Sequence, residues 1–232
     1  MELEQTVRRA ARSGSGAHSA EGVFSEIYEK NLWGGVRGEF YSGSGSDDVV
    51  TRPFAELVRA FIAERGICSV VDLGCGDFRV GRQIVGSALT YVGVDVVDRV
   101  VQRNNERFGT GGVSFVKRDI TTDLLPDAEL CIVRQVLQHL PNDGIIRVLD
   151  KLRGYRYVLV AEHHPAPGRL KQPNRDIPTG RHTRVILDSG VFLEAPPFSI
   201  SGVSVLARMP LTPLVAPGEC LTVYLIESGL TV

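Results

Sequence analysis

Cysteine is scarce in this chain, and it forms no recognisable motif. The four cysteines among 232 residues, Cys68, Cys75, Cys131 and Cys220, are widely spaced and show neither metal-ligand spacing nor the density of a disulfide framework. The sequence also lacks a secretory apolar segment and any apolar run long enough to cross a bilayer. We therefore expect a protein of the reducing cytoplasm, with no metal site and no membrane partner.

The sequence also has no large excess of positive or negative charge. Lys and Arg number 26 and Asp and Glu 27, so the formal net charge is −1, while 43% of residues are hydrophobic. Because no basic excess is present, nucleic acid is not expected as a partner. The polar, small-residue start, residues 1–20, predicts a flexible tail ahead of one globular domain.

Strand and helix patterns alternate from Ser69 onwards. Such alternation predicts an α/β fold, with a mostly parallel sheet that carries helices on both faces. The expected strands are residues 69–73, 90–96, 113–120, 129–134, 155–162, 199–209 and 220–228, and the expected helices between them are 77–85, 98–108 and 142–152. Two further helices, 24–35 and 49–65, precede the first strand, and a long polar loop, 163–182, follows the fifth.

A glycine turn follows the first predicted strand. In VVDLGCGDFRVG (residues 70–81), Gly74 and Gly76 allow a ligand to approach the backbone at the edge where open α/β sheets bind nucleotides. Asp95 ends the second strand, where a carboxylate can accept both hydroxyls of a ribose. Arg79 replaces the third glycine of a dinucleotide motif, and Asp72 would repel a pyrophosphate but attract an ammonium.

These motifs in combination resemble class I S-adenosylmethionine-dependent methyltransferases over residues 69–162. The resemblance rests on VVDLGCGDF, YVGVDVV, FVKRDI and CIVRQVLQHLP. It implies a Rossmann-like methyltransferase fold with a seven-stranded sheet and an N-terminal helical lid. It also implies that the cofactor is S-adenosyl-L-methionine, with S-adenosyl-L-homocysteine as product. The residues that would bind it are Asp72, Gly74 and Gly76 along the methionine, Asp95 and Val96 at the ribose, Asp119 and Ile120 at the adenine, and Arg134 and Gln135 on the floor.

The resemblance extends to a bacterial subgroup that is associated with glycan and natural-product pathways. Trp33, the SGSGS stretch, Thr51, NRDIPTG and Pro197-Phe198 follow one another as in that subgroup, but the spacing after Arg181 departs from it. The implied acceptor is a small molecule of natural-product or sugar type, with O-methylation slightly favoured over N-methylation. Residues 1–20 would be the tail, 21–66 the lid and 67–232 the cofactor-binding domain of a monomer or homodimer.

The stretch YSGSGSDDVVTRPF (residues 41–54) has two interpretations. Its composition favours a flexible linker. Because no second domain is present to link, a loop that grips the cofactor carboxylate through backbone N–H groups and the hydroxyls of Ser42, Ser44 and Ser46 is the better hypothesis. Such a loop would be mobile and would become ordered when the cofactor binds.

The acceptor side of the site rests on polar and aromatic candidates. Each also has an ordinary alternative, as a loop or packing residue. The candidate bases are His139, His163, His164, His182 and Asp176. The candidate acceptor-binding residues are Asn174, Arg181 and the three aromatic lid residues Tyr28, Trp33 and Tyr41.

Two other functions are compatible with a nucleotide fold. A nicotinamide-dependent (NAD) oxidoreductase would also use Asp95, but the missing third glycine and Asp119 argue against it. A non-catalytic binding protein would be expected to have a damaged cofactor set, whereas this set is complete.

Overall fold

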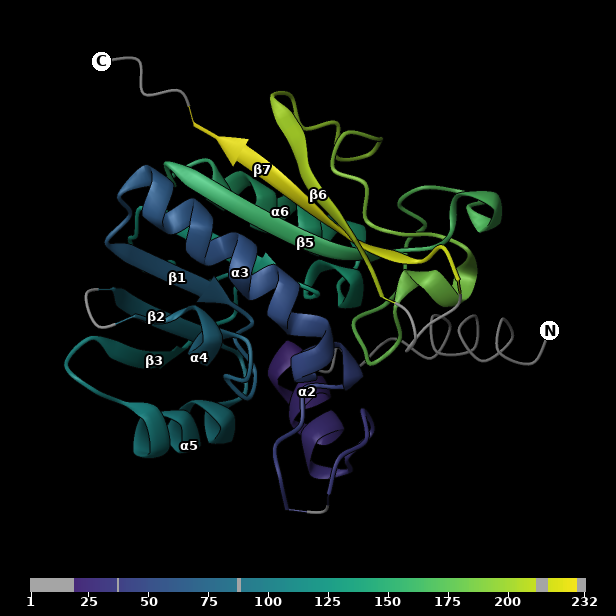
Figure 1. Cartoon of the computed structure of the whole chain (residues 1–232). Helices are drawn as coiled ribbons and strands as arrows, with labels where there is room; N and C mark the ends of the chain where they lie inside the picture. The colour runs from purple at the N-terminus through teal and green to yellow at the C-terminus, as the bar shows by residue number, and fades with distance from the viewer. Residues whose placement is uncertain (1–18, 37, 87–88, 212–216, 229–232) are drawn as a thin grey trace.

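The computed structural model describes residues 19–36, 38–86, 89–211 and 217–228. Seven strands form one sheet in the order β3-β2-β1-β4-β5-β7-β6 (Figure 1). Their bounds are Ser69–Leu73 (β1), Thr90–Asp95 (β2), Val113–Lys117 (β3), Leu130–Arg134 (β4), Tyr157–His164 (β5), Val203–Pro210 (β6) and Cys220–Glu227 (β7). The predicted tail falls almost wholly outside the described residues.

The first five strands run parallel, and β7 runs antiparallel to both β5 and β6. The prediction of a mostly parallel seven-stranded sheet is confirmed. The polar residues at the carboxyl ends of β1 to β4 are brought to one edge by this parallel order, because adjacent strands are in nearly matched register.

Helices cover both faces of the sheet. The cluster on one face includes residues of α3 (Asp48–Arg65), α4 (Gly81–Ile84) and α5 (Asp98–Phe108), and the cluster on the other face includes α6 (Asn142–Leu152). The remaining helix, α2 (Ala20–Glu29), lies beside the end of the sheet toward which the arrowhead of β1 points (Figure 1).

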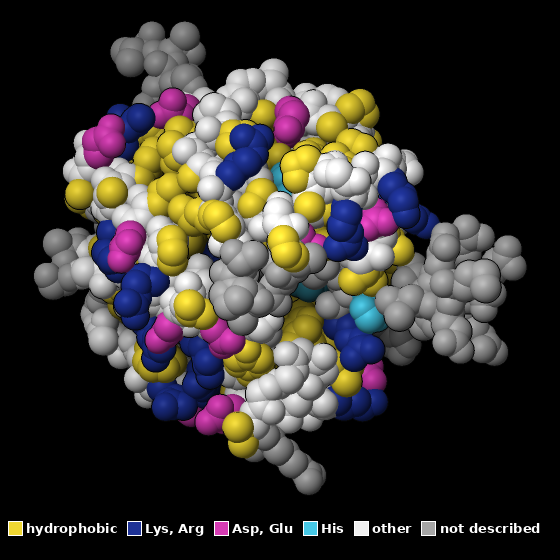
Figure 2. Space-filling view, turned by 45° about the vertical axis from the view of Figure 1, so that its right-hand side comes forward, with side chains coloured by type: hydrophobic (Ala, Val, Ile, Leu, Met, Phe, Trp, Pro, Cys, Tyr) yellow, Lys and Arg dark blue, Asp and Glu magenta, His cyan; other side chains and the backbone are white. Residues whose placement is uncertain are grey.

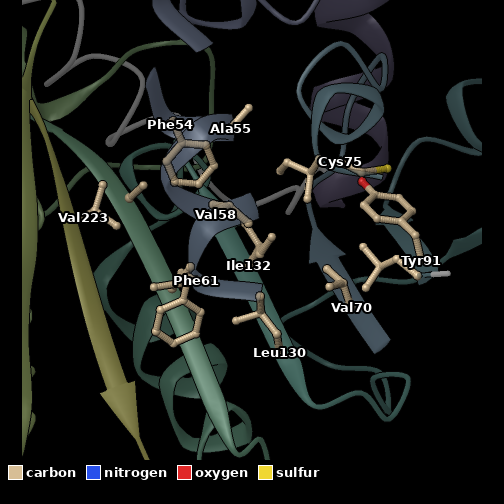
Figure 3. Close-up of a cluster of buried hydrophobic side chains, with 14 of the residues drawn as sticks. Phe54, Ala55, Val58, Phe61, Val70, Cys75, Tyr91, Leu130, Ile132 and Val223 are labelled. Atoms are coloured by element: carbon tan, nitrogen blue, oxygen red, sulfur yellow. The ribbon is translucent and has the colours of Figure 1, made fainter. Parts of the chain in front are cut away.

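The longest helix, α3, illustrates how the sequence builds a layer. Phe54, Val58 and Phe61 recur at helical spacing and are buried against Leu130 and Ile132 of β4 (Figure 3). Burying each such side chain stabilises the fold by roughly 1.5–3 kcal/mol. The helix ends where predicted, because Gly66 takes the left-handed conformation that favours glycine (φ 61°).

Some predicted bounds are wrong. The helix expected over residues 77–85 is limited to Gly81–Ile84, since Phe78 has a positive φ of 67° that interrupts a helix while its ring packs on Tyr91 and Phe115. The first helix lies over Ala20–Glu29 and not 24–35. Strand β5 continues to His164, so His163 and His164 belong to the sheet and not to the following loop.

Surface and length features agree with the composition. On the face in Figure 2, Lys and Arg are interspersed with Asp and Glu, with no stripe of one sign. Of the helices in the described part of the chain, none combines the length and the apolarity that a membrane span requires.

Candidate functional site

A cavity opens at the carboxyl ends of β1 to β4, between the sheet edge and α2. Its volume is about 1000 Å³ with the open mouth included. Eleven of the predicted cofactor residues line it: Ser42, Ser46, Asp72, Gly74, Gly76, Asp95, Val96, Asp119, Ile120, Arg134 and Gln135. Such a concave site at the end of an open parallel sheet is where α/β proteins bind their ligands.

The glycine turn gives the cavity a backbone floor. Gly74 and Gly76 have φ values of 76° and 53°, which favour glycine. A Cβ at Gly74 would overlap Val136, and one at Gly76 would overlap Ser42. The turn therefore needs glycine both for its conformation and for its close neighbours.

Asp95 is a buried carboxylate that faces this turn. Its Oδ2 accepts a hydrogen bond from the Gly76 N–H at 3.1 Å and its Oδ1 accepts one from the Val97 N–H at 2.9 Å. Burial raises the pKa of Asp95 to about 6, although the backbone N–H groups oppose that shift. Each oxygen keeps a further lone pair, so the side chain can still accept from a ligand hydroxyl.

Asp72 supplies a second buried carboxylate at the end of β1. Its Oδ2 accepts from the Tyr91 hydroxyl at 2.6 Å. Burial raises the pKa of Asp72 to about 6, while Tyr91 and then Arg134 act in the opposite direction. Two carboxylates in this state favour a cationic ligand, because a positive charge would offset the cost of ionising them.

Asp119 and Ile120 close the cavity after β3. The Asp119 Oδ1 accepts from the Thr121 N–H at 2.8 Å and from the Thr121 hydroxyl at 2.6 Å, so this carboxylate stabilises a turn while it lines the cavity. Ile120 is 8% exposed and supplies an apolar surface beside it. A polar acceptor next to an apolar face suits a nucleobase.

The serine-rich stretch is anchored to the glycine turn. The Ser42 N–H donates to Asp77 Oδ2 at 3.1 Å, and the Asp77 N–H donates back to Ser42 Oγ at 3.0 Å. The Ser42 hydroxyl also bonds the Tyr28 hydroxyl at 2.9 Å. These reciprocal contacts fit a loop that belongs to the site and not a linker.

Two predicted members of this stretch lie elsewhere. Ser44 is exposed, because residues 44–46 form a short 3-10 helix that turns its side chain away from the cavity. Thr51 is fully buried within α3, where its hydroxyl accepts from Gln83 Nε2 at 2.8 Å. Neither residue lines the cavity.

Arg134 is the cation at the end of β4. Its Nη2 donates to the Gly45 carbonyl at 2.8 Å, which joins the strand to the serine-rich stretch. Its Nε is buried and has no hydrogen-bond partner. Burial lowers the pKa of Arg134 to about 10, so the guanidinium stays charged at neutral pH. Because the Arg134 side chain lines the cavity, its positive charge fits an anionic group of a ligand.

Aromatic rings form the wall opposite the sheet edge. The Trp33 ring lies 5.5 Å from that of Tyr28, 6.0 Å from that of Phe24 and 5.3 Å from that of His139, and all four residues line the cavity. The Trp33 Nε1–H donates to the Arg181 carbonyl at 3.2 Å. The wall thus presents apolar ring surface to a ligand.

His139 is held as a neutral imidazole. Its Nδ1 donates to the Gly180 carbonyl at 3.1 Å, which leaves the lone pair on Nε2, 3.3 Å from the Gln138 amide nitrogen. Burial lowers the pKa of His139 to about 4. A neutral ring with a fixed tautomer can accept a hydrogen bond but is a weak base.

His163, His164 and His182 lie outside the cavity. His163 Nε2 bonds Glu219 Oε2 at 2.9 Å, and His164 stacks on Phe192 at 4.0 Å while its Nε2 donates to the Val191 carbonyl at 2.7 Å. Because successive side chains of a strand point to opposite faces of the sheet, His163 and His164 lie on different faces of β5. Asp176 is also outside, since its Oδ1 accepts from the Asn142 N–H at the start of α6.

The predicted acceptor-binding residues divide into two groups. Tyr28 and Trp33 line the cavity. Asn174 is buried and holds a loop, with Nδ2 donating to three carbonyl groups and Oδ1 accepting from Phe192. Arg181 is exposed, and its backbone carbonyl accepts the hydrogen bond from Trp33. The Tyr41 hydroxyl donates a hydrogen bond to Asp47.

The motifs did not indicate several lining residues: Ala20, Phe24, Cys75, Asp77, Val80, Thr121 and Leu140. Phe24 had a detectable signal, because it lies four residues before Tyr28 and so on the same helix face. Among the residues that the structure describes, no three His, Cys, Asp or Glu side chains are grouped as metal ligands.

Solved structures share this fold. The magnesium protoporphyrin IX methyltransferase ChlM from Synechocystis PCC 6803, with bound SAM, is 16% identical with a TM-score of 0.57, over 92% of this chain and 100% of that one. The N-methyltransferase NodS from Bradyrhizobium japonicum WM9, in complex with S-adenosyl-l-homocysteine, is 14% identical with a TM-score of 0.55, over 76% and 86%.

The N-terminal domain of EvdMO1 with SAH bound is 14% identical with a TM-score of 0.53, over 90% and 99% of the two chains. No protein-family model and no curated protein matches the sequence. At these identities the similarity establishes the fold, which is the Rossmann-like fold of class I S-adenosylmethionine-dependent methyltransferases.

Proposed function

We propose that the protein is an S-adenosylmethionine-dependent methyltransferase that acts on a small-molecule acceptor. The observation that carries the proposal is the pair of buried carboxylates, Asp72 and Asp95, beside a glycine turn at the carboxyl edge of the sheet. Neighbours of the same fold were solved with the cofactor or its product bound, which supports this choice of ligand.

The cavity residues fit the parts of that cofactor. Asp95 would accept the ribose hydroxyls, and Asp119 with Ile120 would hold the adenine. Asp72 suits the ammonium group. The Arg134 guanidinium, together with Ser42, suits the carboxylate.

The charge of the cavity distinguishes this cofactor from NAD. Four aspartates line it, Asp72, Asp77, Asp95 and Asp119, against the two arginines Arg118 and Arg134. This negative balance favours a ligand with a sulfonium and an ammonium, and it disfavours a pyrophosphate. The predicted oxidoreductase is therefore the weaker alternative.

Methyl transfer requires alignment and exclusion of water more than acid–base chemistry. The cofactor would supply an electrophilic methyl group, and the chain would orient it through the glycine turn and the carboxylates. The rings of Phe24, Trp33 and His139 would exclude water and offer a surface to the acceptor.

An oxygen acceptor remains slightly favoured over a nitrogen acceptor. This preference comes from the sequence resemblance. The lone pair on His139 Nε2 faces the Gln138 amide at 3.3 Å, so an acceptor hydroxyl would have to displace that contact before it could bond the imidazole. The exposed position of Arg181 gives no support to an acidic acceptor. The lid, the cytoplasmic location and the monomer or homodimer state remain predictions.

Titration calorimetry tests the cofactor. We expect S-adenosylmethionine and S-adenosylhomocysteine to bind at micromolar strength, and Asp95→Ala to weaken binding by roughly 1–3 kcal/mol through the loss of charge-assisted contacts. Asp98→Ala is the matched control, since this nearby carboxylate bonds Gln102 on α5 and does not line the cavity. Binding of NADH without binding of either sulfur compound would contradict the proposal.

A mass-spectrometric screen tests the reaction. The protein is incubated with S-adenosylmethionine and pools of phenols, sugars and amines, and products are scored by the mass gain of one CH₂ unit. Because every acceptor would use the same cofactor site, Asp95→Ala should reduce each gain that the wild type produces at limiting S-adenosylmethionine. Cofactor binding without any product across all pools would favour the non-catalytic binding protein.

A further inference from the structure

The segment between β4 and α6, residues 135–141, forms part of the cavity wall. We refer to it as the β4–α6 loop. Gln135, Val136, His139 and Leu140 line the cavity. Gln135 has a φ of 54°, so the loop begins in a conformation that costs free energy for a residue other than glycine. Its geometry must therefore be fixed by contacts from elsewhere.

Glu162 holds this loop from the side of its N–H groups. The residue lies in β5 and is fully buried. Its Oε1 accepts from the N–H groups of Val136 at 3.1 Å and Leu137 at 2.9 Å, and its Oε2 accepts from the Gln138 N–H at 3.1 Å. One carboxylate thus fixes three successive backbone units, through hydrogen bonds of the stronger, charge-assisted kind.

Arg184 holds the same loop from the side of its carbonyl groups. It is also fully buried, in the short helix Arg184–Leu187. Its Nη1 donates to the Leu137 carbonyl at 2.9 Å, and its Nη2 donates to the Leu140 carbonyl at 2.7 Å and to Asn142 Oδ1 at 2.9 Å. The planar guanidinium fixes the far end of the loop, as a flexible ammonium could not.

Neither charged side chain lines the cavity. Two buried ions cost several kcal/mol of desolvation, and an apolar pair of similar volume often gives an equally stable or more stable core. Stability alone therefore does not account for Glu162 and Arg184. What the two charges provide is a defined backbone path for the residues that face the ligand.

We propose that Glu162 and Arg184 are positioning residues, which hold the β4–α6 loop in the geometry that cofactor binding requires. The inference rests on the proposed function for its ligand. Both residues act through the loop backbone, and neither contacts the cofactor or the acceptor.

The single tryptophan provides a readout that needs no ligand. Trp33 is the one tryptophan of the chain, and its ring lies 5.3 Å from that of His139 in the β4–α6 loop. A loop that is released from Glu162 or Arg184 should expose Trp33 to acrylamide. Fluorescence quenching therefore reports loop order, and calorimetry with S-adenosylhomocysteine reports its consequence for binding.

The test compares two conservative variants with a buried polar control. Glu162→Gln replaces one accepting oxygen with an amide donor, and Arg184→Lys keeps the charge but loses the fork. Tyr155→Phe is the control, because its buried hydroxyl bonds the Pro126 carbonyl at 2.8 Å ahead of β5, at the opposite end of the sheet from the loop. All three should lower the melting temperature, but only the first two should raise quenching of Trp33 and weaken S-adenosylhomocysteine binding, by about tenfold.

Each outcome is decisive. If Glu162→Gln and Arg184→Lys lower only the melting temperature, like Tyr155→Phe, the two residues are merely structural and the proposal fails. If the wild-type protein does not bind S-adenosylhomocysteine, the proposed function fails, and the quenching comparison still decides whether the two charges hold the loop.

Discussion

Cofactor binding should release protons near pH 6. Burial raises the pKa of both Asp72 and Asp95 from 3.8 to about 6, and both carboxylates line the cavity. Ionising either carboxylate in the free protein therefore costs roughly 3 kcal/mol more than ionising an ordinary exposed aspartate. A ligand with a sulfonium and an ammonium offsets this cost, so binding should return both pKa values toward their ordinary range.

The sign and size of the effect follow from linkage. At pH 6 each carboxylate of the free protein is half protonated, so binding should release about one proton in total, and at pH 7 about a fifth of a proton. At pH 5 only about a tenth of each group is ionised, so the affinity should be about 100-fold lower than at pH 7. Affinity therefore rises as the pH rises through 6.

Calorimetry in buffers of different ionisation enthalpy measures this release directly. Asp72→Asn should reduce it to about half a proton at pH 6, because the amide oxygen can still accept from Tyr91 but no longer titrates. His139 contributes nothing there, since its pKa is about 4. An affinity that is flat from pH 5 to 7, with no dependence on buffer, would refute the reasoning that these buried carboxylates meet a cation.

Three further outcomes are expected. Gly74→Ala should weaken S-adenosylhomocysteine binding at least tenfold by calorimetry, because a Cβ at positive φ overlaps Val136; unchanged affinity would show that the turn does not contact the ligand. Asn174→Ala should lower the melting temperature by about 5–10 °C, since four buried hydrogen bonds are lost; a shift below 2 °C would contradict that role, as would a loss of cofactor affinity larger than that of Tyr155→Phe. His163→Gln should leave binding within about twofold of the wild type, because its partner Glu219 also lies outside the cavity, and loss of product in the acceptor screen would reinstate His163 as a base.

The sheet-edge side of the cavity could be predicted because its residues are local in sequence. Asp72, Gly74 and Gly76 lie within five residues, and Asp95 ends the next strand. Parallel pairing then brings the strand ends together, whatever the details of the core.

Tyr28, Trp33 and His139 of the opposite wall were among the candidates, but the contacts that hold this wall in place could not be predicted because they are long-range. Trp33 meets Arg181 across 148 positions, and Arg184 meets Leu137 across 47. Neither pairing leaves a periodic signal, and Glu162 looks like an ordinary polar residue at the end of a strand. His163 and His164 were expected in a loop at the site. They lie outside the cavity because β5 continues through them and pairs with β7.

The attachment of the N-terminal segment has a consequence for the order of folding. Ser42 is anchored by Asp77, and Trp33 by the carbonyl of Arg181, so α2 and its neighbours leave the ribosome long before their partners exist. Contacts of such sequence separation form late. The aromatic wall would therefore assemble only after most of the chain has been synthesised, and pulse-labelled hydrogen exchange during refolding should find the amides of α2 protected after those of β1 and β4.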